Sequence, residues 1–484
     1  MNILSNKRGS LLVTILFITT LFLTIYTGII SVNLLRQKLY LQQVAKQQAL
    51  HVAEAGANYY RWHLAHNRTD FFDGGSNPGG PGPYGPYIHN YTDPTGTISG
   101  TFSLMVTPPP SGSTLVTIES TGWMDNFPNI KRKIVVSYGI PSLAHYSFLT
   151  NTEAWFGPSE NLHGEVRSNT GLRIDGMNDS IVTSAVTTYY CPSYHGCSWG
   201  SCSSPCTWIS SLSRCRCPAV WGAGPNSSLW SFPVSNFDFT SISTNYTDLH
   251  TLASTTGDHY NSAGRGYHVV FNSNGTYNIS RIDNLNNLRQ EDDSGSCKNI
   301  AERISSETSI ATNKAVPSNG VIYIHDNVWV EGTLNGKVTL VAVNAVPEGS
   351  DVIADRKSIL IANNLRYLAR DDNHMLGLVA QKDIKIYHDA PPDDLIIDGF
   401  LLAQNGRVFR NYYCNSGDRI VKNSIKIYGG IISYGMWNFT YVSGATVIDG
   451  YRNTNTIYDS NGTYAPPPSF PTTGEYVFIS WNEE

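Results

Sequence analysis

A long apolar stretch without charged residues begins close to the start of the chain. It extends from Ser10 to Leu35, spans 26 residues, and follows the positively charged Lys7 and Arg8. As an α-helix, this stretch is about 39 Å long, which is enough to cross a hydrocarbon core about 30 Å thick. Because positive charges tend to remain on the cytoplasmic side, the pattern predicts that the chain after Leu35 lies outside the membrane.

The helical pattern continues beyond the apolar stretch without a helix-breaking residue. Leu41, Val44 and Val52 lie near one face, and a patch of small residues around Gly56 follows, on which another backbone can pack closely. The pattern predicts one helix over residues 10–66, about 85 Å long, apolar in its first half and amphipathic in its second. Such a helix suits the core of a filament, because the apolar half can hold a subunit in the membrane and later pack against its neighbours.

Three interpretations of this N-terminus compete. A cleaved secretory signal has an apolar core of about 7–15 residues followed by a small-residue cleavage site. The stretch here is longer, and no such site is obvious after it. A plain membrane anchor is the second interpretation. The third places a cut before the apolar stretch, between Gly9 and Ser10, and leaves residues 1–9 as a leader.

The next segments show a change from helix to strand patterning. Residues 67–97 are rich in Gly and Pro, which predicts a loop or linker. Residues 98–140 contain alternating apolar and polar positions in three runs, separated by Pro108–Pro110 and by Asp125 and Asn126. This region is predicted to form a small antiparallel sheet.

Short apolar strands joined by polar or Gly corners recur beyond residue 140. The segment 399–409 echoes 164–174, and 377–386 is a similar unit. Short strands at such intervals favour a parallel β-solenoid-like head, with a β-sandwich as the alternative because the spacing is irregular. We therefore predict an α+β chain, mostly β, with a β-rich region at 141–320, a cysteine-rich insert at 191–217, and a solenoid-like C-terminal module at 321–484.

The composition agrees with an extracellular β protein. Charged residues make up 15% of the chain, and 42 Gly, 24 Pro and 28 Tyr favour strands and turns. The formal net charge of −5 is too small to indicate a nucleic-acid partner, and none is expected.

The cysteines indicate disulfide bonds in an oxidising compartment. Their number is even, and six of them fall between residues 191 and 217. The C-x2-C pairs of a zinc site are absent, so no metal is expected. Six cysteines allow fifteen pairings, which the sequence cannot distinguish, and the two distant cysteines are candidates to pair with each other. The disulfide candidates are Cys191, Cys197, Cys202, Cys206, Cys215, Cys217, Cys297 and Cys414.

The sequence contains no catalytic motif. Neither G-x-S-x-G nor H-E-x-x-H occurs, no EF-hand loop is present, and the thirteen histidines, His325 among them, are scattered. Acidic pairs at Asp371–Asp372 and Asp393–Asp394 are flanked by loop-forming residues and are interpreted as solvated. We therefore expect neither enzymatic activity nor a cofactor. A membrane-tethered enzyme acting on polysaccharide is the alternative, because solenoid lyases and hydrolases use clustered carboxylates.

Two motifs carry a resemblance to a known family. The sequence Lys7-Arg8-Gly9 followed by Ser10-Leu11-Leu12-Val13 looks like a class III-type prepilin cleavage site, and Ala53-Glu54-Ala55-Gly56 resembles the AEAG element of PilX-like minor pilins. The likeness covers residues 7–66 and parts of 140–481. It implies cleavage after Gly9 by a prepilin peptidase and N-methylation of Ser10. Major pilins carry Glu at the fifth mature position, where this chain has Thr14, which argues against a bulk subunit and for one at the tip.

The resemblance implies a minor pilin-like subunit of a type IV pilus-like filament. Its expected partners are other pilins and minor pilins, the inner membrane and the prepilin peptidase, with a surface or glycan ligand as a candidate for the head. It is expected to be a single-pass membrane protein before assembly, with an extracytoplasmic head that reaches the cell surface and acts in assembly initiation or adhesion. A tip pseudopilin of type II secretion is a further alternative. The helix residues assigned to the membrane and to assembly are Leu11, Leu12, Thr14, Leu16, Phe17, Leu21, Phe22, Ala53, Glu54, Ala55 and Gly56.

Overall fold

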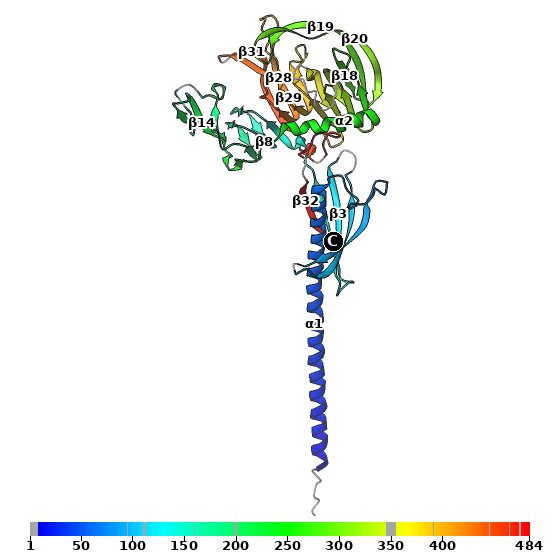
Figure 1. Cartoon of the computed structure of the whole chain (residues 1–484). Coiled ribbons are helices and arrows are strands. Elements are labelled where there is room, and N and C mark those ends of the chain that lie inside the picture. The colour runs from blue at the N-terminus through cyan, green and yellow to red at the C-terminus, as the bar shows by residue number, and fades with distance from the viewer. Residues whose placement is uncertain are drawn as a thin grey trace, which may run out of the picture. The chain divides into compact units, whose positions relative to one another are not determined.

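The computed structural model divides the chain into two compact units. Unit 1 comprises Met1–Pro109, Leu115–Gly139 and Tyr476–Glu484, and unit 2 comprises Pro110–Thr114 and Ile140–Glu475. The described residues are mostly in strands of several sheets, with one long N-terminal apolar helix (Figure 1). The residues that the structure describes are 8–93, 95–109, 113–158, 160–197, 200, 202–344, 355–390, 392–444, 446–463, 465–473 and 476–484.

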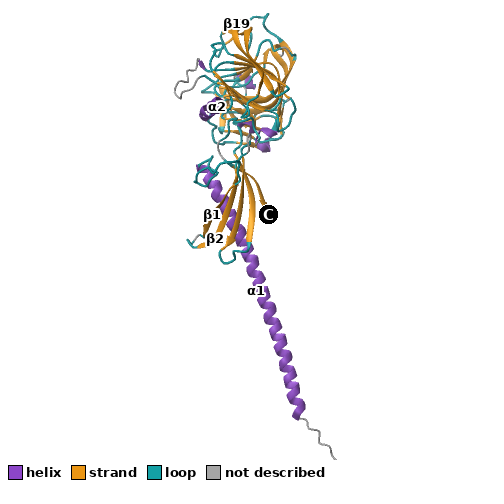
Figure 2. Ribbon diagram, turned by 90° about the vertical axis from the view of Figure 1, so that its right-hand side faces the viewer, coloured by secondary structure: helices purple, strands orange, loops and turns teal. Residues whose placement is uncertain are grey.

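Unit 1 consists of one helix and one antiparallel sheet. The helix α1 (Arg8–His66) is unbroken, as the pattern of the sequence predicted, and a sheet covers its C-terminal part (Figure 2). The order in the sheet is β1-β2-β3-β4-β32, and all neighbours are antiparallel. The strands are β1 (Tyr84–Thr92), β2 (Ile98–Thr107), β3 (Leu115–Met124), β4 (Lys131–Gly139) and β32 (Val477–Glu483).

The core of unit 1 lies between α1 and the sheet. Burial alternates along β2 and β3, so that residues such as Leu104 and Ile118 point toward the helix. The helix backbone comes very close to β3 at Gly122, where an added Cβ atom would lie 2.3 Å from the amide nitrogen of Ala53 and 2.5 Å from the carbonyl oxygen of Ala49. Only glycine at position 122 allows this approach.

Two strands of this sheet lie where the sequence predicted something else. The predicted linker at 67–97 contains β1, an edge strand, and an edge position tolerates the proline that β1 includes. The predicted C-terminal module at 321–484 has its last strand, β32, in the sheet of unit 1, paired with β4. The pairing of β32 with a strand more than 330 residues earlier is set by tertiary contacts, which local patterning does not encode.

Unit 2 is built from ladders of parallel strands. The similar segments 377–386 and 399–409 are neighbours in these ladders, with Gly377 opposite Phe400. The echo between 164–174 and 399–409 does not correspond to such a pairing, because Val166 lies opposite Phe148 and Val182, whereas Gly399 lies opposite Gly429. One ladder runs β17 (Asp258–Tyr260), β21 (Val321–Ile324), β23 (Lys337–Ala342), β25 (Met375–Ala380), β27 (Asp394–Ala403), β29 (Val421–Ser433), β5 (Tyr146–Thr150), β8 (Glu165–Ser168), β11 (Val182–Ser184) and β16 (Trp230–Ser231). Another ladder runs β18 (Tyr267–Asn272), β22 (Val328–Leu334), β24 (Ile359–Tyr367), β26 (Ile384–Ile386) and β28 (Val408–Arg410). In addition, β31 (Thr446–Tyr458) pairs in parallel with the first half of β29.

The ladders enclose an apolar interior and are covered on one outer face by a helix. In β21, Ile322 and Ile324 belong to the interior cluster, whereas Val321 and Tyr323 face outward and pack with α2 (Thr244–Thr255). This alternation follows from the two-residue period of a strand. Outward residues of β17 and β21 therefore lie next to α2.

A long antiparallel hairpin arches across unit 2 (Figure 1). It consists of β19 (Thr276–Glu291) and β20 (Cys297–Ala315), and β18 precedes it as a further antiparallel neighbour. Its far end is held by the disulfide between Cys297 and Cys414 and by a buried contact between Glu302 and Lys385.

The cysteine-rich insert forms a small sheet of its own. Its order is β12-β14-β13, with β12 (Thr188–Cys191), β13 (Thr207–Ile209) and β14 (Arg214–Pro218). The remaining short strands of unit 2 are β6 (Ala154–Phe156), β7 (Asn161–Leu162), β9 (Leu172–Ile174), β10 (Met177–Asn178), β15 (Val220–Trp221) and β30 (Thr440–Ser443).

Candidate functional site

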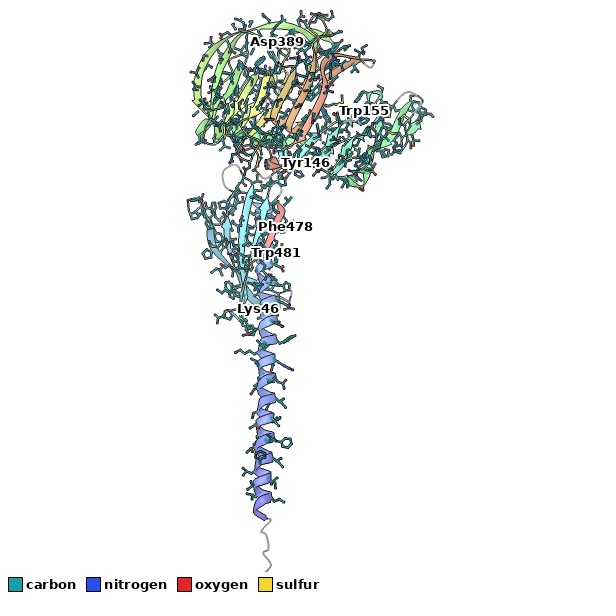
Figure 3. The ribbon with its side chains drawn as sticks, turned by 180° about the vertical axis from the view of Figure 1, so that it is seen from behind. Lys46, Tyr146, Trp155, Asp389, Phe478 and Trp481 are labelled. Atoms are coloured by element: carbon teal, nitrogen blue, oxygen red, sulfur yellow. A yellow bond between two sulfur atoms is a disulfide. The ribbon has the colours of Figure 1, made fainter. Side chains whose placement is uncertain are left out.

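The apolar half of α1 is bare over its whole circumference. Figure 3 shows side chains that project from α1 on the N-terminal side of Lys46, where no other element of unit 1 covers them. The most apolar 18-residue window within Leu11–His66 has a mean hydropathy of 2.1 and no buried residue, so this helix is long and apolar enough to cross a membrane. An exposed apolar surface of this size is typical of segments that contact lipid or other proteins.

Five hydroxyl side chains within this half of α1 are bonded to the helix itself. The hydroxyl of Thr20 donates to the carbonyl oxygen of Leu16 at 2.9 Å, and that of Ser31 donates to the carbonyl oxygen of Thr27 at 2.8 Å. Thr19, Thr24 and Thr27 make equivalent bonds. Because a hydroxyl bonded in this way presents no free donor to lipid, these residues are compatible with a membrane environment.

The predicted membrane and assembly residues fall into two groups. Those in the first turns of the helix are exposed: Leu11, Leu12, Thr14, Leu16, Phe17, Leu21 and Phe22. In the second group, Ala53 and Gly56 are buried against the subunit's own sheet, where a Cβ atom on Gly56 would meet Ser120 and Phe102. Glu54 and Ala55 are half-buried. The small-residue patch thus docks α1 onto β2 and β3 of the same chain.

The predicted processing site lies at the edge of the described structure. The backbone of Gly9 and Ser10 is helical, and the burial of these two residues is outside the described part of the chain. Residues 1–7 of the predicted leader also lie outside the described residues.

The eight cysteines form four disulfides. The pairs are Cys191–Cys197, Cys202–Cys215, Cys206–Cys217 and Cys297–Cys414. The first three close short loops within the insert, and the fourth closes a loop of 117 residues. A cross-link that closes a longer loop removes more conformational entropy from the unfolded chain, so the last pair is the one that constrains unit 2 most.

A cleft of about 440 Å³ among the described residues of unit 2 is a candidate for a ligand site. Three aromatic rings line its floor: Trp437 lies 4.8 Å from Phe148 and 5.0 Å from Phe156, between ring centroids. Phe148 and Phe156 are buried, so their positions are set by the core of the unit. A volume of this size is typical of small-molecule sites, which combine an apolar floor with a few polar groups.

The walls of the cleft are polar. One wall is the outer edge of β31 from Arg452 to Thr456. Among the described strands, β30 pairs with β31 only as far as Gly450, and beyond that residue β31 pairs with β29 alone. The other wall carries Glu160, whose pKa is raised to about 7 because burial disfavours its ionised form. Its carboxyl group can therefore both donate and accept hydrogen bonds at pH values below about 7.

The carboxyl groups that line the cleft can be compared with those of a glycoside hydrolase. Hydrolysis of a glycosidic bond uses two carboxyl groups about 5–9.5 Å apart. Glu160 is the only carboxylate among the described residues that line the cleft. The acidic pairs noted in the sequence lie elsewhere. Asp371 contacts His374 in a loop, whereas Asp394 begins β27 and accepts hydrogen bonds from Asn423 and Ser424 of the neighbouring strand β29.

The cleft residues were not identified from the sequence. Glu160 precedes β7, Trp437 follows β29, and Arg452 lies in β31, so more than 290 residues separate the first from the last. The one local signal is the alternating run Arg452-Asn453-Thr454-Asn455-Thr456, which is typical of a solvent-exposed strand edge and does not indicate a particular ligand.

Comparisons with known proteins give little further information. No protein-family model and no curated protein matches the sequence. One solved structure, the competence-associated pilin ComZ from Thermus thermophilus, aligns over 91% of this chain and 97% of its own length, with 12% identity and a TM-score of 0.26. A likeness at that TM-score carries no argument about fold or function.

Proposed function

We propose that this chain is a minor pilin-like subunit of a type IV pilus-like filament. Its α1 helix would hold it in the inner membrane and then pack among the helices of other pilins. Its remaining residues would form an extracytoplasmic head that acts in assembly initiation, adhesion or both. The proposal includes cleavage after Gly9 by a prepilin peptidase and methylation of Ser10.

One observation carries this proposal: a single unbroken helix is packed against the sheet in its second half and exposes apolar residues in its first half. The second half of α1 is docked on the sheet through Ala53, Tyr60 and Leu64, which are fully buried. The first half projects from that sheet and exposes its apolar residues, with Phe17 and Phe22 each 68% exposed. A plain anchor needs about 20 apolar residues, and it does not need the same rigid helix to continue into the fold of the head.

The architecture of unit 2 supports a β-solenoid-like head over a β-sandwich. Successive strands such as β21, β23, β25, β27 and β29 pair in parallel without a break in register, and their inward residues form one continuous apolar cluster. A sandwich places antiparallel strands in two facing sheets. We therefore favour stacked coils as the description of the head.

We expect a photoreactive amino acid at position 22 to cross-link this chain to other pilins. Phe22 is exposed on the apolar half of α1, so in a filament it must contact neighbouring helices. Filaments sheared from cells would be irradiated and analysed by immunoblotting and mass spectrometry. The matched control is the same amino acid at position 102, because Phe102 is buried between α1 and the sheet. Adducts with other pilins from position 22 but not from 102 support assembly through α1, and equal patterns from both positions contradict it.

We also propose that the cleft binds a glycan. Sugars present both hydroxyl groups and apolar ring faces, which match the exposed edge of β31 and the ring of Trp437. Replacing Trp437 with Ala should reduce binding to a printed oligosaccharide array at least about tenfold, which corresponds to about 1.4 kcal/mol. Trp155→Ala is the matched control, because this exposed tryptophan does not line the cleft. Absence of array binding by the unaltered chain would refute the glycan proposal.

Two other functions, an enzyme acting on polysaccharide and a tip pseudopilin of a secretion system, are less well supported. We propose that the chain is not an enzyme, because the cleft has a single carboxylate among its described lining residues. A tip pseudopilin of a secretion system would have the same helix and the same membrane topology. Deletion of the gene distinguishes the two, since loss of surface filaments with normal secretion indicates a pilus subunit.

A further inference from the structure

Three histidines that are far apart in the sequence meet where α2 covers the ladder of unit 2. His250 lies in α2, His259 lies in β17, and His325 follows directly after β21. The ring centroids of His250 and His259 are 4.8 Å apart, those of His259 and His325 are 4.8 Å apart, and those of His250 and His325 are 5.4 Å apart. One nitrogen from each ring can be chosen so that all three lie within 4.8 Å of one another.

The register of the strands explains why the rings converge. His259 is the parallel partner of Tyr323, and parallel partners in a ladder share a face. His325 is two residues beyond Tyr323 and continues the ladder through its amide, which donates to the carbonyl oxygen of Tyr260 at 2.9 Å. His259, Tyr323 and His325 therefore occupy the outward face, toward α2.

The helix brings the third histidine to the same place. Tyr246, Leu249 and Ala253 are spaced at i, i+3 and i+7 and pack with Tyr323 in the cluster beneath α2. His250 is four residues after Tyr246, which places it on the same side of the helix. Its ring centroid lies 5.4 Å from that of Tyr323.

Several polar atoms in this cluster are buried without a partner in the described structure. They are Nδ1 of His325, Nε2 of His259 and the hydroxyl oxygen of Tyr323. His325 is only 5% exposed and Tyr323 is fully buried. A buried polar group without a hydrogen bond costs about 1–3 kcal/mol, so three of them together call for a partner such as a water molecule or an ion.

The environment of His250, His259 and His325 (the histidine trio) differs from that of another partly buried histidine in unit 2. His268, in the same unit, contacts Glu307 through Nδ1 and Glu331 through Nε2, and these carboxylates raise its pKa. By contrast, the rings of His259 and His325 contact each other and the rings of His250 and Tyr323. The backbone of Asn344 hydrogen-bonds the His325 ring, which would orient it, and Nδ1 of this ring is buried.

We propose that His250, His259 and His325 form a binding site for a divalent first-row transition metal ion, with zinc as the ion to test. Neutral imidazole is a preferred ligand of zinc, and three histidines leave a fourth position for water. Zinc–nitrogen distances of about 2.0–2.1 Å place tetrahedral ligand nitrogens about 3.3 Å apart, so the rings need small rotations to reach an ion. Bound metal would join α2 to β17 and β21 and stabilise this end of the ladder.

The proposal is tested by metal titration of the full chain, purified in detergent without a polyhistidine tag and treated with a chelator. Isothermal titration with Zn²⁺ should show one ion per chain. His250→Gln and His259→Gln should each weaken binding by at least about 100-fold, because loss of a ligand exceeds the 10–100-fold effect of losing an outer-shell partner. Both residues are half-buried, so these variants retain the fold more readily than one at His325.

Two controls separate this site from unspecific binding. His163→Gln removes a histidine that pairs with Asp179 at the surface, and it should leave zinc binding unchanged. Mg²⁺, which prefers oxygen ligands, should not bind, whereas Co²⁺ should give the visible absorption of a tetrahedral nitrogen site. The proposal is overturned if the unaltered chain binds no zinc, if His163→Gln lowers affinity as much as the other two variants, or if His250→Gln and His259→Gln bind as the unaltered chain does.

Discussion

Replacing Asp449 with Ala is expected to destabilise unit 2 by about 3–5 kcal/mol, the largest effect of any single side chain in this account. Asp449 Oδ1 lies 2.6 Å from Arg410 Nη1, and both side chains are fully buried. The carboxylate also accepts hydrogen bonds from the amides of Tyr413 and Gly450. Removal of this carboxylate leaves the Arg410 guanidinium buried without an anionic partner. The Nε and Nη2 atoms of Arg410 already lack a hydrogen-bond acceptor in the described structure.

Urea unfolding of the full chain, followed by hydrogen exchange in unit 2, measures this effect. Asp293→Ala is the control, because the Asp293 side chain that pairs with Lys382 is 66% exposed, and this ion pair should contribute less than about 1 kcal/mol. The double variant Arg410→Met with Asp449→Leu should recover most of the loss, since it removes both charges. Equal effects of Asp449→Ala and Asp293→Ala would show that the buried pair has no special role.

A valine at position 122 is expected to separate α1 from the sheet of unit 1. The atoms that its Cβ would meet belong to the helix backbone at Ala49 and Ala53, which cannot move aside without moving the whole helix. Overpacking of this kind costs about 1–3 kcal/mol and more where backbone blocks the change. Hydrogen exchange of the amides from 45 to 64 should rise, because the docked half of the helix would lose its packing.

Thr121→Val is the matched control for this substitution. It introduces the same side chain one residue earlier on β3, where the alternation of the strand turns it away from the helix. Protection of residues 45–64 should therefore remain as in the unaltered chain. If Gly122→Val leaves that protection unchanged as well, the close contact between α1 and β3 does not hold the head to the helix.

Local patterning was sufficient to predict α1 and the strands β2 to β4. The apolar stretch and the absence of helix breakers up to His66 determine the helix, and alternation determines the strands. The echoes between segments such as 377–386 and 399–409 also identified strands that are neighbours in a ladder. These features depend on residues close in sequence or on similarity between segments, both of which the sequence displays directly.

Features that depend on long-range register could not be predicted. The disulfide partners of Cys202 and Cys206 are set by the pairing of strands in the insert, and fifteen pairings were compatible with the sequence. The cleft requires Glu160 and Trp437 to meet across 277 residues. His250, His259 and His325 appeared unrelated for the same reason, since only the pairing of β17 with β21 and the docking of α2 bring them together.

Mass spectrometry of the N-terminus of the exported protein tests the central claim most directly. A subunit whose apolar helix enters a filament after processing should begin at Ser10 and carry a methyl group on its amine. Detection of an intact Met1 on the exported protein would contradict this account and leave α1 as a membrane anchor alone.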